Sequence, residues 1–313
     1  MVEAQLNFFL IGAPKSGTTT IHERLSAHPE VFLSPLKEPN HYATDIDVAA
    51  FSPAFRANTP LDLAPYFAEK PLAPRQVGFV RDPKQYARLF EEAGPHHAVV
   101  GECSTSYLWS AEAAGNVAQS HAGARILVVL RNPVERLFSH WLMARKYGFT
   151  NQPLREAVRR DVQHPNPGWG RSELFVEAGL YAGPLRRWFA LFPRDQVRVL
   201  FTEDLALEET WTGLADWLGI GPPIPGTVGE KANEAGLARW EGINRWLTVT
   251  GAKRWAATAM PGRWKDAARR RWYSSEGMPK LSEEDRKVLF AHFAQDVEEL
   301  ERLLAVDLSH WRP

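Results

Sequence analysis

Residues 12–19 read Gly-Ala-Pro-Lys-Ser-Gly-Thr-Thr, a segment with the residue types of an anion-binding loop. Glycines let the backbone turn closely around a bound group, and the N–H groups that open a helix attract an anion. A nucleoside-triphosphate loop reads G-x-x-x-x-G-K-[ST]. The spacing of Gly12 and Gly17 fits that pattern, but Thr18 stands in the lysine position and the lysine is Lys15. Thr18 cannot reach a γ-phosphate, whereas Lys15 can contact a group attached to a 5′-phosphate, so we expect an anion of mononucleotide type.

A second group of candidate anion ligands follows the apolar run 125–130. Arg131 leaves the end of this predicted strand, and Pro133 suits the first turn of the helix expected over 134–147. Ser139 lies about two turns into that helix, so its hydroxyl and the Arg131 guanidinium can meet one anion. The alternatives are a surface ion pair for Arg131 and a solvated helix serine for Ser139. We expect Glu135 and Arg136 to be charges on the helix surface.

Together these two segments resemble the sulfotransferases that use 3′-phosphoadenosine-5′-phosphosulfate (PAPS), above all the bacterial and heparan-sulfate-sulfotransferase-like branches. Residues 14–19 look like the 5′-phosphosulfate loop of that family, and residues 131–141 look like its 3′-phosphate signature. The resemblance implies PAPS as co-substrate and adenosine 3′,5′-bisphosphate (PAP) as product. It also implies that Arg131 and Ser139 bind the 3′-phosphate. The implied ligands of the 5′-phosphosulfate are Pro14, Lys15, Ser16, Gly17, Thr18 and Thr19.

The segment 28–42 contains a Lys-Glu-Pro run and resembles the stretch after the first helix in the same branches. By residue match, Glu38 is the implied general base, because the proton of an acceptor hydroxyl must leave as the S–O bond forms. His41 is a rival base, since a histidine fills this role in other branches. Lys15 is the third catalytic candidate, since it would offset charge on the bridging oxygen of the leaving group. Lys37 either orients the acceptor or sulfonate, or forms a solvated pair with Glu38.

Two further segments extend the resemblance. Residues 101–107 are similar to an acceptor-side Glu-x-Ser/Thr-Pro-x-Tyr segment, with Thr105 in place of its proline and Cys103 where some members carry a lysine. We interpret Cys103 as a small buried residue rather than a nucleophile. Residues 231–239 resemble a late loop that folds over the 3′-phosphate, which makes Lys231 a candidate phosphate contact. The basic stretch 239–273 contains several tryptophans. Together, its basic and aromatic residues would bind an anionic or sugar acceptor, a membrane face or single-stranded nucleic acid. The alternative is that the tryptophans pack on the core.

The elements that must position these residues follow an α/β pattern. Apolar runs at 6–12, 98–101, 125–130 and 197–201 alternate with helical periodicity at 18–27, 134–147, 180–192 and 204–218. Such alternation predicts a three-layer α/β/α fold with a central parallel sheet, and the resemblance specifies a P-loop-NTPase-like sulfotransferase fold. We expect one domain over 1–313, with acceptor-side insertions at 45–86 and 221–280. A last helix, capped by Ser282, is expected to bury one stripe from Leu289 to Leu304.

Composition narrows the classes of protein. The 313 residues include 37 basic and 37 acidic side chains, so the formal net charge of +0 excludes a globally basic nucleic-acid binder. The single cysteine excludes an intrachain disulfide and a Cys-cluster metal site. No apolar run is long enough for a membrane span or a signal peptide. We therefore expect a cytoplasmic protein with no integral membrane segment and no nucleic-acid partner. The sequence does not determine the oligomeric state.

The predicted reaction moves a sulfuryl group from PAPS to a hydroxyl or amine of a small-molecule or carbohydrate acceptor. No metal is expected, because the reacting group of this donor carries less charge than a triphosphate. One alternative is a nucleoside or metabolite kinase, which Thr18 and the lack of an acidic Mg²⁺ motif disfavour. The other is a non-catalytic binder of adenosine bisphosphate.

Overall fold

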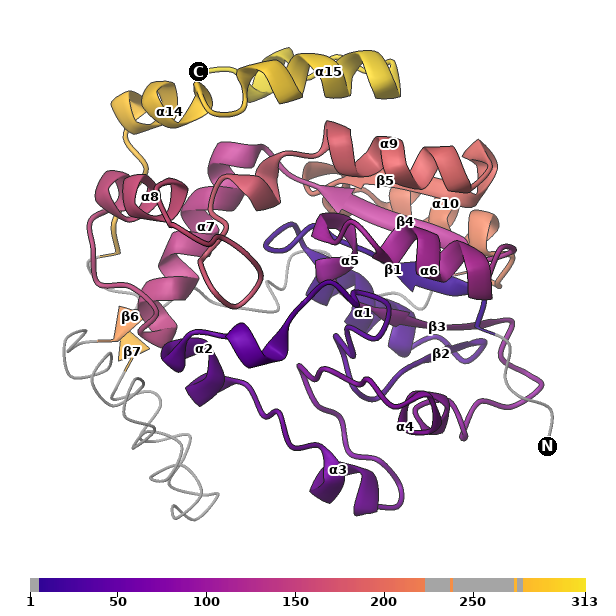
Figure 1. The fold of residues 1–313 in the computed structure, drawn as a ribbon. Helices are drawn as coiled ribbons and strands as arrows, with labels where there is room; N and C mark the ends of the chain where they lie inside the picture. Colours follow the sequence, from indigo (N-terminus) through magenta and orange to yellow (C-terminus); the bar gives the residue numbers. More distant parts are fainter. Residues whose placement is uncertain (1–5, 223–236, 239–272, 275–277) are drawn as a thin grey trace. The chain divides into compact units, whose positions relative to one another are not determined.

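The computed structural model describes residues 6–222, 237–238, 273–274 and 278–313 (Figure 1). The chain divides into two compact units, each assembled from separate segments. The first comprises 1–46, 61–131 and 181–232, and the second comprises 47–60, 132–180 and 233–313. The single domain over 1–313 and its insertions stay predictions, and most of the insertion 221–280 lies outside the described residues.

A five-stranded parallel sheet forms the centre of the first unit (Figure 1). Its register places Leu10 beside Cys103 on one side and Leu127 on the other. All five carboxyl ends therefore lie at the same edge of the sheet, which is where open α/β sheets bind ligands. In spatial order the strands are β2 (Val31–Leu33), β3 (Val99–Cys103), β1 (Phe8–Leu10), β4 (Arg125–Leu130) and β5 (Val197–Phe201).

Helices cover both faces of this sheet. On one face, α1 (Thr18–Ser26) and α10 (Glu208–Leu218) pack in one buried cluster with Phe8 and Leu10 of β1. Phe9 points to the opposite face, because side chains alternate along a strand. There its ring contacts Tyr107 of the short helix α5 (Ser106–Trp109) at 6.5 Å between centroids. The predicted α/β/α layers and central parallel sheet are confirmed.

Further helices of the first unit lie around this sandwich. Two of them, α6 (Ala113–Ser120) and α9 (Ala182–Leu191), pack against each other and against α5. Segment 61–88 carries α3 (Ala64–Ala68) and α4 (Pro83–Arg88), and 3-10 turns occur at Arg194–Gln196 and Glu203–Ala206. The helix predicted over 204–218 therefore starts as a 3-10 turn, and its α-helical part begins at Glu208.

The second unit is built around α7 (Pro133–Tyr147). The Asn132 side chain accepts hydrogen bonds from the N–H groups of Val134 and Glu135, and Gly148 ends the helix at φ 81°. These are strong start and stop signals, and they explain why this helix was predictable. The other elements are α2 (Pro53–Asn58), α8 (Leu154–Val162), α14 (Glu283–Phe290), α15 (Ala294–Leu304), the antiparallel pair β6 (Leu237–Ala238) and β7 (Tyr273–Ser274), and 3-10 turns at Val48–Ala50, Glu177–Gly179 and Ser309–Trp311.

The prediction of a single helix after Ser282 is wrong in one respect. The Ser282 side chain caps the first turn by accepting from the N–H of Asp285 at 3.0 Å, as expected. The chain then turns at residues 291–293 and continues as a second helix, α15. The turn leaves Phe293 fully buried, and Leu289, Val297 and Leu300 are buried with it, so the predicted apolar stripe is shared by two helices. In the described part of the chain, no helix is both long and apolar enough to cross a membrane.

Candidate functional site

The loop between β1 and α1 forms a cradle of backbone N–H groups. Lys15 and Gly17 have φ angles of 70° and 98°, and Gly17 is the N-cap of α1. A Cβ at Gly17 would lie 2.7 Å from Leu205 Cδ1, so only glycine fits there without strain. No side chain caps α1 and no acidic residue lies in its first turn. The first-turn N–H groups are therefore left for an exogenous anion.

Strands on one side of β1 hold this loop in place. Gly12 and Ala13 continue the pairing with β4, since the Val129 N–H donates to Gly12 O and the Ala13 N–H donates to Val129 O. Arg131 Nη1 then donates to Lys15 O at 3.3 Å. Beyond β5, the Thr202 hydroxyl donates to Ser16 O at 2.7 Å. The loop carbonyls thus bind protein groups, and the structure brings together Lys15 and Arg131, the two predicted donor-site cations.

The remaining loop residues differ in exposure. Ser16 is fully buried and Thr18 is nearly so, whereas Pro14, Gly17 and Thr19 are partly exposed. Ser16 Oγ has no hydrogen-bond partner in the structure, which is unusual for a buried hydroxyl. The uncapped helix start, the adjoining cations and this orphaned hydroxyl fit an anion with several oxygens, such as a phosphosulfate.

Two predicted donor ligands lie elsewhere in the chain. Ser139 is partly buried on α7 of the second unit, and its role stays a prediction. Lys231 lies outside the described residues, as do residues 239–272 of the basic Trp-rich stretch. The expected surface position of Arg136 is wrong, because this side chain is fully buried and donates to Phe175 O. Residues near 175, distant in sequence, cover this face of α7.

Glu38 is fixed by its backbone at the end of β3. Its N–H donates to Cys103 O at 2.7 Å, and its φ is 61°. Lys37 Nζ lies 3.3 Å from Glu38 Oε1, and the two side chains are only 6% and 18% exposed. This pair is not the solvated loop pair that was the alternative. An ammonium group holds the Glu38 carboxylate at the edge of the sheet where the loop begins.

His41 lies in the same segment and stays a rival base. Its Nδ1 is 2.8 Å from Val80 O, and its ring stacks on Tyr86 with centroids 3.9 Å apart. Burial lowers the pKa of His41, the bond to Val80 opposes this shift, and Arg81 adds to it. The imidazole is therefore neutral at pH 7. With its Nδ1–H directed at Val80 O, Nε2 is the nitrogen that can accept a proton.

Glu102 was not among the predicted site residues. It is fully buried at the end of β3, where Tyr86 and Tyr107 donate to Oε1 at 2.7 and 2.6 Å and Ser104 donates to Oε2 at 2.5 Å. Burial raises the pKa of Glu102 to about 7, against the lowering effect of the three hydroxyls. The signal in the sequence was an acid near a strand end with a run of hydroxyl residues that begins two positions later.

Two neighbours complete the site. His22 on α1 is partly buried, and its buried Nε2 has no hydrogen-bond partner in the structure. Burial, and then the charge of Lys37, lower the pKa of His22 to about 4, so it is neutral at pH 7. Cys103 is 1% exposed and burial raises the pKa of its thiol. The interpretation of Cys103 as a small buried residue is confirmed.

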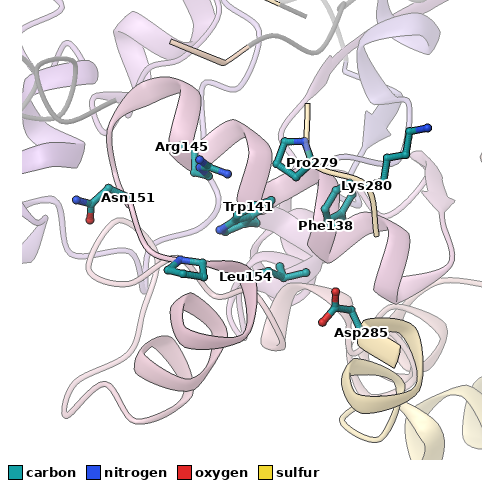
Figure 2. A pocket seen from close by; sticks show the side chains of 9 residues that line it. Phe138, Trp141, Arg145, Asn151, Leu154, Pro279, Lys280 and Asp285 are labelled. Atoms are coloured by element: carbon teal, nitrogen blue, oxygen red, sulfur yellow. The ribbon is translucent and has the colours of Figure 1, made fainter. Parts of the chain in front are cut away.

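The second unit contains an open groove of about 350 Å³ (Figure 2). Phe138, Trp141 and Arg145 of α7 line it together with Pro279 and Lys280, which precede α14. The Arg145 guanidinium lies 4.7 Å from the Trp141 ring centroid. Trp141 is 3% exposed and borders the groove. Ser139 is not one of the residues that line it.

The first unit thus gathers the groups needed to transfer an anionic group. The anion cradle, two cations and the Glu38 carboxylate lie at or near the carboxyl ends of β1, β3 and β4, and the neutral His41 belongs to the same segment as Glu38. A base close to a bound electrophile can remove a proton from an attacking nucleophile. Among the residues that the structure describes, no group of three or more His, Cys, Asp and Glu side chains could hold a metal ion.

Comparison with solved structures identifies the fold. The crystal structure of a sulfotransferase from Alicyclobacillus acidocaldarius superposes with a TM-score of 0.65 at 24% sequence identity. The alignment covers 99% of this chain and 100% of that one. This match shows the sulfotransferase fold, which confirms that part of the prediction.

Comparison with other sequences identifies the family. Carbohydrate sulfotransferase 15 from Homo sapiens and its counterpart from Rattus norvegicus are each 26% identical to this chain over 251 residues. The alignments cover 69% of this chain but only 44% of those relatives, so the chain spans less than half their length. Residues 7–173, more than half of the chain, match the family described as the sulfotransferase family. The chain therefore belongs to the sulfotransferase family, as its two anion-binding segments predict.

Proposed function

We propose that this sulfotransferase uses PAPS as its donor and transfers the sulfuryl group to a hydroxyl or amine. The observation that carries the proposal is the hydrogen bond from Arg131 Nη1 to Lys15 O. It joins two separate sequence segments, one matching a 5′-phosphosulfate loop and the other a 3′-phosphate signature. PAPS is a nucleotide that carries both groups, which ATP does not.

The loop residues would bind the donor through its 5′-phosphosulfate. First-turn N–H groups of α1 would donate to its oxygens, with Lys15 and the hydroxyls of Thr18 and Thr19 beside them. Bound PAPS supplies an activated sulfuryl group and a stable leaving group. Lys15 would offset the negative charge that grows on the bridging oxygen, an electrostatic effect worth a few kcal/mol, or about 10²–10³ in rate. Arg131 would bind the 3′-phosphate, and the same role is proposed for Ser139.

Glu38 would act as the base. Its carboxylate is held by Lys37 and lies at the edge of the sheet where the donor loop begins. It would accept the proton of the acceptor as the nucleophile approaches sulfur in line with the leaving group. His41 Nε2 is the alternative acceptor of this proton, and the kcat values of Glu38→Gln and His41→Gln separate the two.

A carbohydrate is the acceptor class we propose to screen first. The support is the similarity to carbohydrate sulfotransferase 15, a name that describes those relatives. A screen should record PAP formed from PAPS with neutral and anionic oligosaccharides, and with phenols and simple alcohols as the competing classes. Turnover only with phenols would contradict the carbohydrate proposal while leaving the donor proposal intact.

Calorimetry tests the donor. PAP and ATP–Mg²⁺ are titrated separately into the wild type and into Arg131→Ala. We expect PAP to bind with a Kd in the micromolar range or below, and Arg131→Ala to lose most of this affinity because a charge-assisted contact to phosphate is removed. Tighter binding of ATP–Mg²⁺, insensitive to Arg131, would contradict the proposal and favour a kinase. PAP binding without any turnover would favour the non-catalytic binder.

A further inference from the structure

The segment that carries both candidate bases has an unusual backbone. Glu38 and Asn40 have φ angles of 61° and 52°, in a left-handed region that costs energy for residues other than glycine. Such a conformation persists only where surrounding contacts hold it. The contacts of segment 38–42 therefore decide where a base would stand relative to the donor.

Three groups that hold this segment meet at one carboxylate. Ser104 Oγ, Tyr107 Oη and Tyr86 Oη all donate to Glu102, which is fully buried. Each of the three also contacts one residue of segment 40–42. The Asn40 N–H donates to Ser104 Oγ at 3.0 Å, the Tyr42 N–H donates to Tyr107 Oη at 3.1 Å, and the His41 ring stacks on Tyr86.

Three consecutive residues are thus fixed through three different side chains to the same buried acid. Those side chains come from three places: the residue after β3, the helix α5 and the helix α4. A carboxyl group that is only part of the core needs hydroxyl donors, but those donors need not all contact one strained segment. The arrangement instead sets the position of that segment relative to the end of β3.

We propose that Glu102 is the positioning residue for the base-bearing segment 38–42, acting through Ser104, Tyr107 and Tyr86. The proposal rests on the proposed function for its catalytic meaning. Because Glu102 is fully buried, it would affect donor and acceptor only through this segment. As a carboxylate it accepts all three hydroxyl protons and so leaves the oxygens of Ser104 and Tyr107 free to accept from the backbone.

Protonation of Glu102 would weaken this arrangement. The protonated acid must donate one hydrogen bond, so one hydroxyl has to turn its own proton elsewhere. Burial raises the pKa of Glu102 to about 7. The titratable groups that influence Glu102 are Tyr86, Tyr107, Tyr42, Cys103 and Glu38, and the raised pKa values of Tyr86, Tyr107 and Cys103 keep these three neutral at pH 7.

Hydrogen exchange of the segment tests the geometry without any substrate. We expect amides of a peptide covering 38–42 to exchange about fivefold faster in Ser104→Ala, since one hydrogen bond is worth about 1 kcal/mol. Ser34→Ala is the matched control: it removes another buried hydroxyl, which donates to Leu36 O at 2.8 Å and does not touch Glu102. Equal exchange rates in wild type, Ser104→Ala and Ser34→Ala would overturn the proposal.

Turnover tests the positioning role. The hydrolysis of PAPS, in which water is the acceptor, is measured from pH 5 to 9 as the amount of PAP formed. We expect Ser104→Ala and Glu102→Gln to lower kcat about 100-fold, the effect of misplacing a catalytic group by about 1 Å, with PAP affinity unchanged. Glu102→Gln should also lose the rise of wild-type kcat through pH 7, because its amide mimics the protonated acid, and Ser104→Thr should regain activity.

The results separate the two proposals. A wild type that neither binds PAP nor forms it from PAPS contradicts the proposed function, and the exchange experiment still decides whether Glu102 holds the segment. An active wild type whose kcat and pH profile are retained in Glu102→Gln and Ser104→Ala overturns the positioning role and leaves the sulfotransferase proposal intact.

Discussion

The position of Glu38 makes it the first residue to test. Its backbone is bonded to β3 and its carboxylate to Lys37. We expect Glu38→Gln to lower kcat by about 10²–10⁴-fold, the usual contribution of a general base, and to leave PAP affinity unchanged. Steady-state kinetics with PAPS and calorimetry with PAP measure the two effects.

His41→Gln is the companion variant. If His41 Nε2 takes the proton, the large loss of kcat appears in this variant and Glu38→Gln stays active. A comparable loss in both variants would indicate that the base is one residue and that the other supports its position.

The buried carboxyl of Glu102 gives a prediction about stability. Burial raises its pKa from 4.5 to about 7, so between these pH values the folded chain holds a proton that the unfolded chain has released. Its contribution to the free energy of unfolding is complete below pH 4.5 and falls by about 3 kcal/mol as the pH rises to 7. Denaturant titrations at several pH values should show a flatter profile for Glu102→Gln. The exposed Glu92, replaced by Gln, serves as the control and should keep the wild-type slope.

The residue types at the site were predictable, but their burial was not. Lys15, Glu38 and Arg131 could be named because their motifs are local. Arg136 and Glu102 could not be placed, since each has a contact from a residue outside its own motif. Arg136 is covered near Phe175, and Glu102 is bound by Tyr86, 16 residues before it.

At the scale of elements, the donor loop depends on one glycine. We expect Gly17→Ala to weaken PAP binding at least tenfold and to destabilise the fold by about 1–3 kcal/mol, because alanine is strained at φ 98° and its Cβ would meet Leu205. Gly115→Ala is the control, since nothing lies within 4 Å of a Cβ there and Gly115 is inside the helix α6. The control should bind PAP normally and be slightly more stable. Normal PAP affinity in Gly17→Ala would show that the cradle does not hold the donor.

The predictability of the elements follows from their packing. The strand β4 was predicted to the residue, because a parallel strand that is buried on both faces reads as a continuous apolar run. The edge strand β5 is only partly buried, and it was predicted to the residue from its branched and aromatic residues. The strand β2 has only three residues, too few for a pattern, and it is a strand because it pairs with β3. The helix α8 was missed because its buried face includes the polar residue Asp161, which interrupts the apolar pattern. The Asp161 carboxylate accepts hydrogen bonds from the N–H groups of residues 173–175.

At the scale of the whole molecule, donor binding should stabilise the fold. A ligand that binds only the folded chain adds about 2.7 kcal/mol to the free energy of unfolding at 100 times its Kd. We expect PAP at that concentration to raise the Tm of the wild type by several degrees. The same concentration should leave the Tm of Arg131→Ala nearly unchanged, which differential scanning calorimetry can measure. An equal shift in both proteins would place the bound PAP elsewhere.

The hydrogen bonds to the carbonyls of the loop between β1 and α1 also have a kinetic consequence. Lys15 O and Ser16 O are bound by Arg131 and Thr202, which are groups of the chain itself, so the shape of the cradle does not depend on contacts with its ligand. Capture of the nucleotide should then be a single bimolecular encounter. Its observed rate should rise linearly with concentration and show no plateau, the mark of a preorganised receptor rather than one that closes after contact.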